Sequence, residues 1–107
     1  MSEKFHIAHI LVSYVGIDGV FASRTKEEAV KHINEVLGYI KDGASFEDMA
    51  KKSSDCPSGA MGGLLGEVKP GEMVPEFEKV VFSLSVDEVS DVFESEFGYH
   101  IAKRYSV

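Results

Sequence analysis

The chain has 107 residues, a formal net charge of −7, 44% hydrophobic residues and a single cysteine. These values fit one modest globular domain, and they exclude a disulfide scaffold and a multi-cysteine zinc site. They also exclude a nucleic-acid-binding surface, which needs an excess of Lys and Arg, and no apolar stretch is long enough for a membrane span. We expect a cytoplasmic protein, or one domain excised from a longer exported protein.

The negative charge is concentrated between residues 67 and 96. This stretch carries nine acidic residues against two lysines, a net charge of −7. One interpretation is a solvated acidic face. The other is a negative field beside a binding groove, which would favour neutral or basic partners.

The first half of the chain predicts a strand followed by two capped helices. Residues 5–13 alternate with apolar side chains on both faces, as in a central strand covered on both sides. Residues 14–24 contain two glycines and no clear period, which predicts a long loop. Capping boxes at Thr25 and Ser45 predict a helix that ends at Gly43 and a short helix that runs to about Lys52.

The second half predicts a further helix and three strands. Residues 53–66 are rich in turn formers, and two leucines among the glycines suggest a short strand. Pro75 favours the first turn of a helix whose apolar stripe runs to Leu84. Residues 86–93 and 99–105 read as strands. This order predicts an α+β fold with a mixed or antiparallel sheet.

Two histidines and one cysteine could carry chemistry. His9 and His100 lie in apolar strands, where each could be a structural core histidine, but neighbouring strands would let their rings share a hydrogen bond. Cys56 could be a half-buried thiol or the nucleophile of a thiol hydrolase, although Asp55 disfavours a thiolate. A metal site formed with His6 is disfavoured, because His6 and His9 face opposite sides of one strand.

Six short motifs occur together in the chain, and in this order they resemble the parvulin-type peptidyl-prolyl cis/trans isomerases. The motifs span about residues 5–105 and are His9-Ile-Leu-Val12, Gly43-Ala-Ser-Phe46 with Met49-Ala50, Ser53-Ser-Asp-Cys-Pro-Ser-Gly59, Gly62-Gly63 with Leu65-Gly66, Met73-Val-Pro-Glu-Phe77 and Phe97-Gly-Tyr-His-Ile101.

The resemblance implies one parvulin-type domain over residues 1–107, with a four-stranded antiparallel sheet surrounded by about four helices and a proline-binding groove on the sheet. It implies that Cys56 lies near the substrate carbonyl, where other members have aspartate. It further implies a catalytic set and a set that holds the proline ring. These are His9, Cys56, Ser95 and His100, and then Leu65, Met73, Phe77 and, at the edge of the pocket, Phe97.

The chain departs from the family pattern at two places. Leu64 stands where an acidic residue usually follows the paired glycines, and the loop 14–24 has Arg24 as its single basic residue, with Lys26 just beyond. The resemblance therefore implies an isomerase of Xaa-Pro polypeptides that assists protein folding, prefers neutral or basic residues before proline and does not require phosphorylation. The alternative is a proline-peptide-binding chaperone module without catalysis. For either function we expect a monomer that needs no metal and no cofactor, in the cytoplasm or as one domain of an exported foldase.

Overall fold

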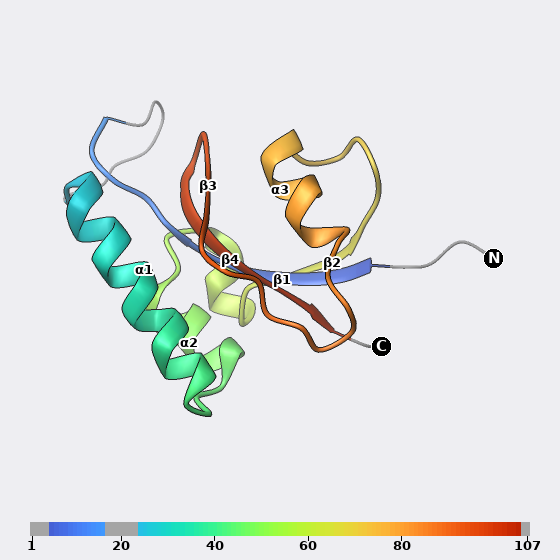
Figure 1. Ribbon diagram of the computed structural model, residues 1–107, viewed down its shortest axis with the longest axis horizontal. Helices are drawn as coiled ribbons and strands as arrows, with labels where there is room; N and C mark the ends of the chain where they lie inside the picture. The colour runs from blue at the N-terminus through green and yellow to red at the C-terminus, as the bar shows by residue number, and fades with distance from the viewer. Residues whose placement is uncertain (1–4, 17–23, 106–107) are drawn as a thin grey trace.

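A computed structural model gives the fold and describes residues 5–16 and 24–105. The strands form one antiparallel sheet in the order β2-β1-β4-β3, which confirms the predicted architecture (Figure 1). Three α-helices and one 3₁₀ helix surround it. The elements are β1 (Phe5–Val12), α1 (Lys26–Lys41), α2 (Phe46–Ser53), η1 (Pro57–Met61), β2 (Leu64–Val68), α3 (Pro75–Val81), β3 (Phe93–Ser95) and β4 (Gly98–Tyr105).

The sheet is covered on both faces, as the apolar alternation in residues 5–13 predicts. Figure 1 shows α1 and α2 on one side of the sheet and α3 on the other. Ala8, Ile10 and Val12 of β1 are buried in the core under α1 and α2, whereas Ile7 is buried in a second core with Phe77 of α3. Successive side chains of a strand point to opposite faces, so β1 contributes to both cores.

The caps of the first two helices differ in completeness. Thr25 forms the full capping box of α1: its Oγ1 accepts from Glu28 N at 3.1 Å, and Glu28 Oε1 accepts from Thr25 N at 2.8 Å. At α2, Ser45 Oγ accepts from Asp48 N at 3.3 Å, but its hydroxyl donates to Glu47 Oε2 at 3.1 Å. The described bonds form one half of the predicted box at Ser45, and no bond from Ser45 N back to the Asp48 carboxylate is described.

The prediction of a strand over residues 86–93 is wrong for all but its last residue. Residues 86–92 run beside β4, yet a single isolated bridge joins Val89 to Lys103, and β3 begins at Phe93. Ser90 explains the irregularity, because its Oγ accepts from Ala102 N at 2.9 Å in place of a backbone carbonyl. Asp87 also has a φ of +68°, which regular strands do not adopt.

The end of the third helix and the loop 14–24 are the two other places where the described structure bears on the sequence predictions. Leu84 is buried as expected, but it lies beyond the end of α3. The predicted loop 14–24 falls largely on residues 17–23, which lie outside the described residues, and its two ends are joined by a hydrogen bond of 2.9 Å from Val15 N to Arg24 O. In the parts of the chain that the structure describes, no helix is long and apolar enough to cross a membrane.

Candidate active site

The two central strands bring His9 and His100 together. β1 and β4 pair so that His9 lies opposite Ala102 and Leu11 opposite His100, which makes the histidines diagonal neighbours on one face. Their Nδ1 atoms are 3.3 Å apart, and their rings stack with centroids 5.5 Å apart. Only 5% of His9 and 3% of His100 is exposed. The predicted pairing of the two rings is therefore present.

Ser95 extends this pair into a hydrogen-bonded chain. Its Oγ accepts from Phe97 N at 3.1 Å and lies 2.6 Å from His100 Nε2. The hydroxyl has a second lone pair and a proton, so it can accept from Nε2 or donate to it, and the tautomers of His100 and His9 follow that choice. The other ring nitrogen of His9, Nε2, is buried and has no hydrogen-bond partner among the described residues.

Both histidines are held in the neutral form. Burial lowers the pKa of His9 from 6.5 to about 4. Burial, and then the neighbouring His9, lower the pKa of His100 from 6.5 to about 3. Since removal from water penalises the charged imidazolium, the pair is uncharged near pH 7.

Aromatic rings enclose the histidine pair. Phe77 of α3 is 1% exposed, and its ring centroid lies 5.6 Å from each imidazole in an edge-to-face arrangement. Phe93 stacks on His100 with centroids 5.1 Å apart. Sequence reasoning missed Phe93 as a site residue. The sequence analysis placed Phe93 only as the last residue of the predicted strand over 86–93. In the sheet it is the register partner of His100.

The remaining apolar residues named from the sequence lie around this centre. Leu65 and Met73 are partly buried and pack against the same cluster as Phe77. Phe97 is 45% exposed and follows Ser95 by two residues. It is tied to β1 through its carbonyl oxygen, which accepts from Ser13 Oγ at 2.9 Å.

Cys56 lies at the N-terminus of η1, beside the end of β1. The hydrogen bond described for its Sγ comes from Ser58 Oγ at 3.2 Å, so no bond between the thiol and the histidine pair is described. Asp55, the preceding residue, anchors this segment to β1: its N donates to Leu11 O at 2.7 Å and its Oδ2 accepts from Ser13 N at 2.8 Å. Cys56 is thus positioned by these bonds of Asp55 and by its own backbone N, which donates to Ser54 Oγ at 3.3 Å.

The two basic residues near the loop 14–24 are both paired with acidic groups. Arg24 Nη1 lies 2.7 Å from Asp55 Oδ2, and Lys26 Nζ lies 3.5 Å from Glu94 Oε2. Sequence reasoning did not anticipate either pair, because each joins segments far apart in the chain. The pairing leaves this rim without an excess of positive charge.

A hollow of about 450 Å³ opens next to Ser95. It lies between the start of α3 and the turn that joins β3 to β4, so it adjoins the serine that bonds His100. Its lining residues are Val74, Pro75, Glu76, Glu94, Ser95 and Glu96. Three carboxylates therefore surround an opening at the edge of the histidine site.

Fold and site together define a class of protein. The sheet order β2-β1-β4-β3, with a neutral histidine pair on its two central strands and phenylalanines packed against that pair, is the architecture of a parvulin-type domain.

Comparison with known proteins identifies the family. The rotamase family model, described as the PPIC-type PPIase domain, matches residues 9–106. The chain is 35% identical to the peptidyl-prolyl cis-trans isomerase Pin1 of Digitalis lanata, over 96% of this chain and 97% of that protein. It is 36% identical to TbPIN1, whose solution structure superposes with a TM-score of 0.88 over 99% of this chain and 100% of that one. The chain belongs to the PpiC-type peptidyl-prolyl isomerase family, the parvulins.

Other relatives are much longer than this chain. The Chaperone SurA of Legionella pneumophila strain Lens is 40% identical over 90% of this chain, but the match covers 21% of SurA. The family domain thus occurs both as nearly a whole protein and as a small part of a larger one.

Proposed function

We propose that the protein is a peptidyl-prolyl cis/trans isomerase that acts on Xaa-Pro bonds without requiring a phosphorylated residue before proline. The observation that supports it most strongly is the neutral, hydrogen-bonded pair of His9 and His100 under the ring of Phe77. An apolar, uncharged site suits this reaction, because rotation about an amide breaks no covalent bond.

The reaction requires selective binding of the twisted amide. Amide resonance gives a barrier of roughly 20 kcal/mol, and catalysis lowers it when the site binds the twisted form better than either planar form. In our proposal Leu65, Met73 and Phe77 hold the proline ring in an apolar pocket, and Phe97 closes its edge. The ring is then fixed while the acyl side rotates.

The polar residues set the environment of the rotating carbonyl. We propose that Cys56 acts electrostatically, as a polar group near that carbonyl, and not as a covalent nucleophile. Ser95 bonds Nε2 of His100, and His100 bonds Nδ1 of His9, so each group restrains the orientation of the next ring. The histidines then act by holding the site together in the neutral state, which their lowered pKa values support.

The charges around the site support a preference for neutral or basic residues before proline. Arg24 lies against Asp55 and Lys26 against Glu94, so the negative charge beside each cation would weaken its attraction for a phosphate. The hollow beside Ser95 adds Glu76 and Glu96, which would repel an acidic side chain and attract a basic one.

The remaining proposals concern the setting of the protein. We propose residues 1–107 as one parvulin-type domain that acts as a monomer on unfolded polypeptides in the cytoplasm. A domain of a longer exported foldase is the alternative compartment. The second candidate function is a chaperone module that binds proline peptides without catalysis, which the name of the SurA relatives favours.

Exchange spectroscopy on Xaa-Pro peptides tests these proposals, with Xaa varied among Ala, Leu, Lys, Glu and phosphoserine. We expect faster cis/trans exchange for Ala, Leu and Lys, and weaker acceleration for Glu and phosphoserine. Binding without acceleration for every peptide would favour the chaperone module. Acceleration for phosphoserine alone would contradict the proposed specificity.

A further inference from the structure

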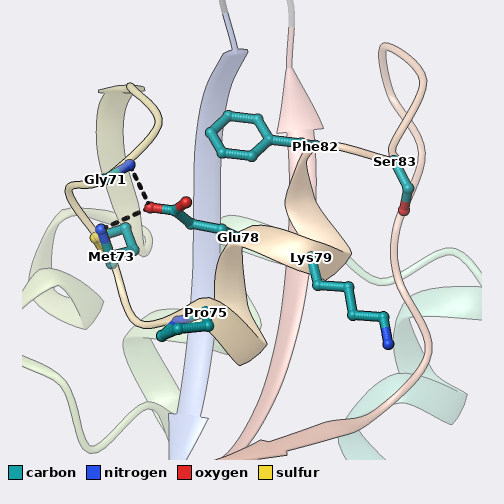
Figure 2. Close-up of a pocket in the computed structure, with 7 residues that line it drawn as sticks. All are labelled: Gly71, Met73, Pro75, Glu78, Lys79, Phe82 and Ser83. Atoms are coloured by element: carbon teal, nitrogen blue, oxygen red, sulfur yellow. Dashed lines mark hydrogen bonds between the residues drawn. The ribbon is translucent and has the colours of Figure 1, made fainter.

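The loop that carries Met73 is held by a carboxylate of the next helix. Glu78 Oε2 accepts two backbone hydrogen bonds from this loop, from Gly71 N at 2.8 Å and from Met73 N at 3.1 Å. Figure 2 shows the Glu78 side chain reaching back from α3 to both groups, in the wall of a hollow of about 730 Å³. Hydrogen bonds to a charged acceptor are roughly twice as strong as neutral ones.

Within the loop, a second carboxylate secures the other end. Glu72 Oε1 accepts from Lys69 N at 2.6 Å, and Glu72 N donates to Lys69 O at 3.2 Å. These two bonds close a local turn, but they do not join it to another element. The two bonds to Glu78 do so, since they connect residues 71 and 73 to α3.

Glu78 connects the loop that carries Met73 to the part of α3 that packs against the histidine pair. Glu78 directly follows Phe77, the ring that packs against both histidines. The carboxylate therefore fixes the backbone of Met73 to the same helical turn that presents Phe77. Met73 and Phe77 also share one apolar cluster, so their spacing defines the wall of the proposed pocket.

We propose that Glu78 is a positioning residue for the proline pocket: its carboxylate sets the distance between Met73 and Phe77. This proposal rests on the isomerase function proposed above. A positioning error of about 1 Å at a binding group is enough to weaken productive binding. Loss of the carboxylate should therefore affect substrate binding more than the rotation step.

The test compares three variants with the parent chain. Glu78→Ala removes the acceptor of both loop bonds, and Glu78→Gln keeps an amide oxygen that can accept from the loop. Glu35→Ala removes the same charge from the exposed face of α1, on the other side of the sheet. Exchange line shapes across a titration with an Ala-Pro peptide give KM and kcat. We expect Glu78→Ala to raise KM about tenfold with kcat changed less than about twofold. Glu78→Gln should restore most of the loss, and Glu35→Ala should match the parent.

Methionine methyl NMR provides a readout that does not depend on activity. The methyl resonance of Met73 should shift in Glu78→Ala, whereas that of Met49, which packs in the opposite core, should stay in place. An unchanged KM and an unchanged Met73 resonance in Glu78→Ala would overturn the positioning role while leaving the isomerase function intact. The positioning role would also be overturned if Glu78→Ala and Glu78→Gln raised KM and lowered kcat to the same extent. A parent chain without activity on any peptide would instead overturn the proposed function.

Discussion

Acidification from pH 7 to pH 5 should destabilise the protein through the buried histidine pair. The pKa of His9 falls to about 4 and that of His100 to about 3 in the folded chain, against 6.5 in the unfolded chain. Below pH 6.5 the unfolded chain therefore binds protons that the folded chain does not. The free energy of unfolding must then decrease as the pH falls through this window.

The magnitude follows from linkage. At pH 5 each unfolded imidazole is almost fully protonated while each folded one is almost fully neutral, which costs about 2 kcal/mol per group. The pair together gives a loss on the order of 4 kcal/mol between pH 7 and pH 5, a large share of the roughly 5–15 kcal/mol that stabilises a typical domain. Glu28 and Glu47 have lowered pKa values, but their contribution is lost below 4.5, outside this window.

Urea unfolding at pH 7, 6 and 5, followed by circular dichroism, measures this loss. Titration of the imidazole Cε1 protons by NMR over the same range should show His9 and His100 unprotonated in the folded chain. His9→Asn, whose amide can replace Nδ1 in the bond to His100, should have about half the pH dependence. Stability that varies by less than about 1 kcal/mol, together with folded histidines that titrate near 6.5, would refute the reasoning.

Three further outcomes are expected. Gly63→Ala should destabilise the fold by about 3 kcal/mol or more in urea unfolding, because its φ is +81° and a Cβ would lie 2.3 Å from His9 O. Gly66→Ala, with a φ of +77° and open space, should cost about 1 kcal/mol, and equal losses would contradict the clash. Arg104→Lys should cost about 2 kcal/mol, since Arg104 Nη1 donates to Leu84 O at 3.0 Å and its guanidinium lies 4.0 Å from the Phe5 ring; an unchanged urea midpoint would contradict this. Cys56→Asp should keep acceleration of Xaa-Pro exchange within about tenfold, and its loss in a folded variant would contradict an electrostatic role.

The elements that the sequence predicted correctly are those encoded by local chemistry. Thr25 and Glu28 satisfy each other across one helical turn, so the start of α1 can be read from four residues. The prediction of a strand over residues 86–93 was wrong because a contact distant in the sequence decides the structure there. The apolar pattern of this segment is compatible with a strand, but the hydroxyl of Ser90, in place of a backbone carbonyl, accepts the hydrogen bond of Ala102 N, twelve residues away.

In the candidate site, too, some contacts could be predicted from the sequence and others could not. The sequence predicted that His9 and His100 could share a hydrogen bond if their strands were neighbours, and the family resemblance added Ser95, which does bond His100. The bond from Glu78 to Met73 was not foreseen. It depends on the path of a loop in space, and no period or spacing in the sequence encodes that path.

The central strands also constrain when the site can exist. His9 and His100 are 91 residues apart, and they meet only when β1 pairs with β4, the last of the described strands. Contacts of such long sequence separation form slowly in folding. During synthesis the histidine pair therefore cannot form until β4 has left the ribosome. An unfinished chain has no such pair, so the pair exists only when residues 5–12 and 98–105 have both been made and joined.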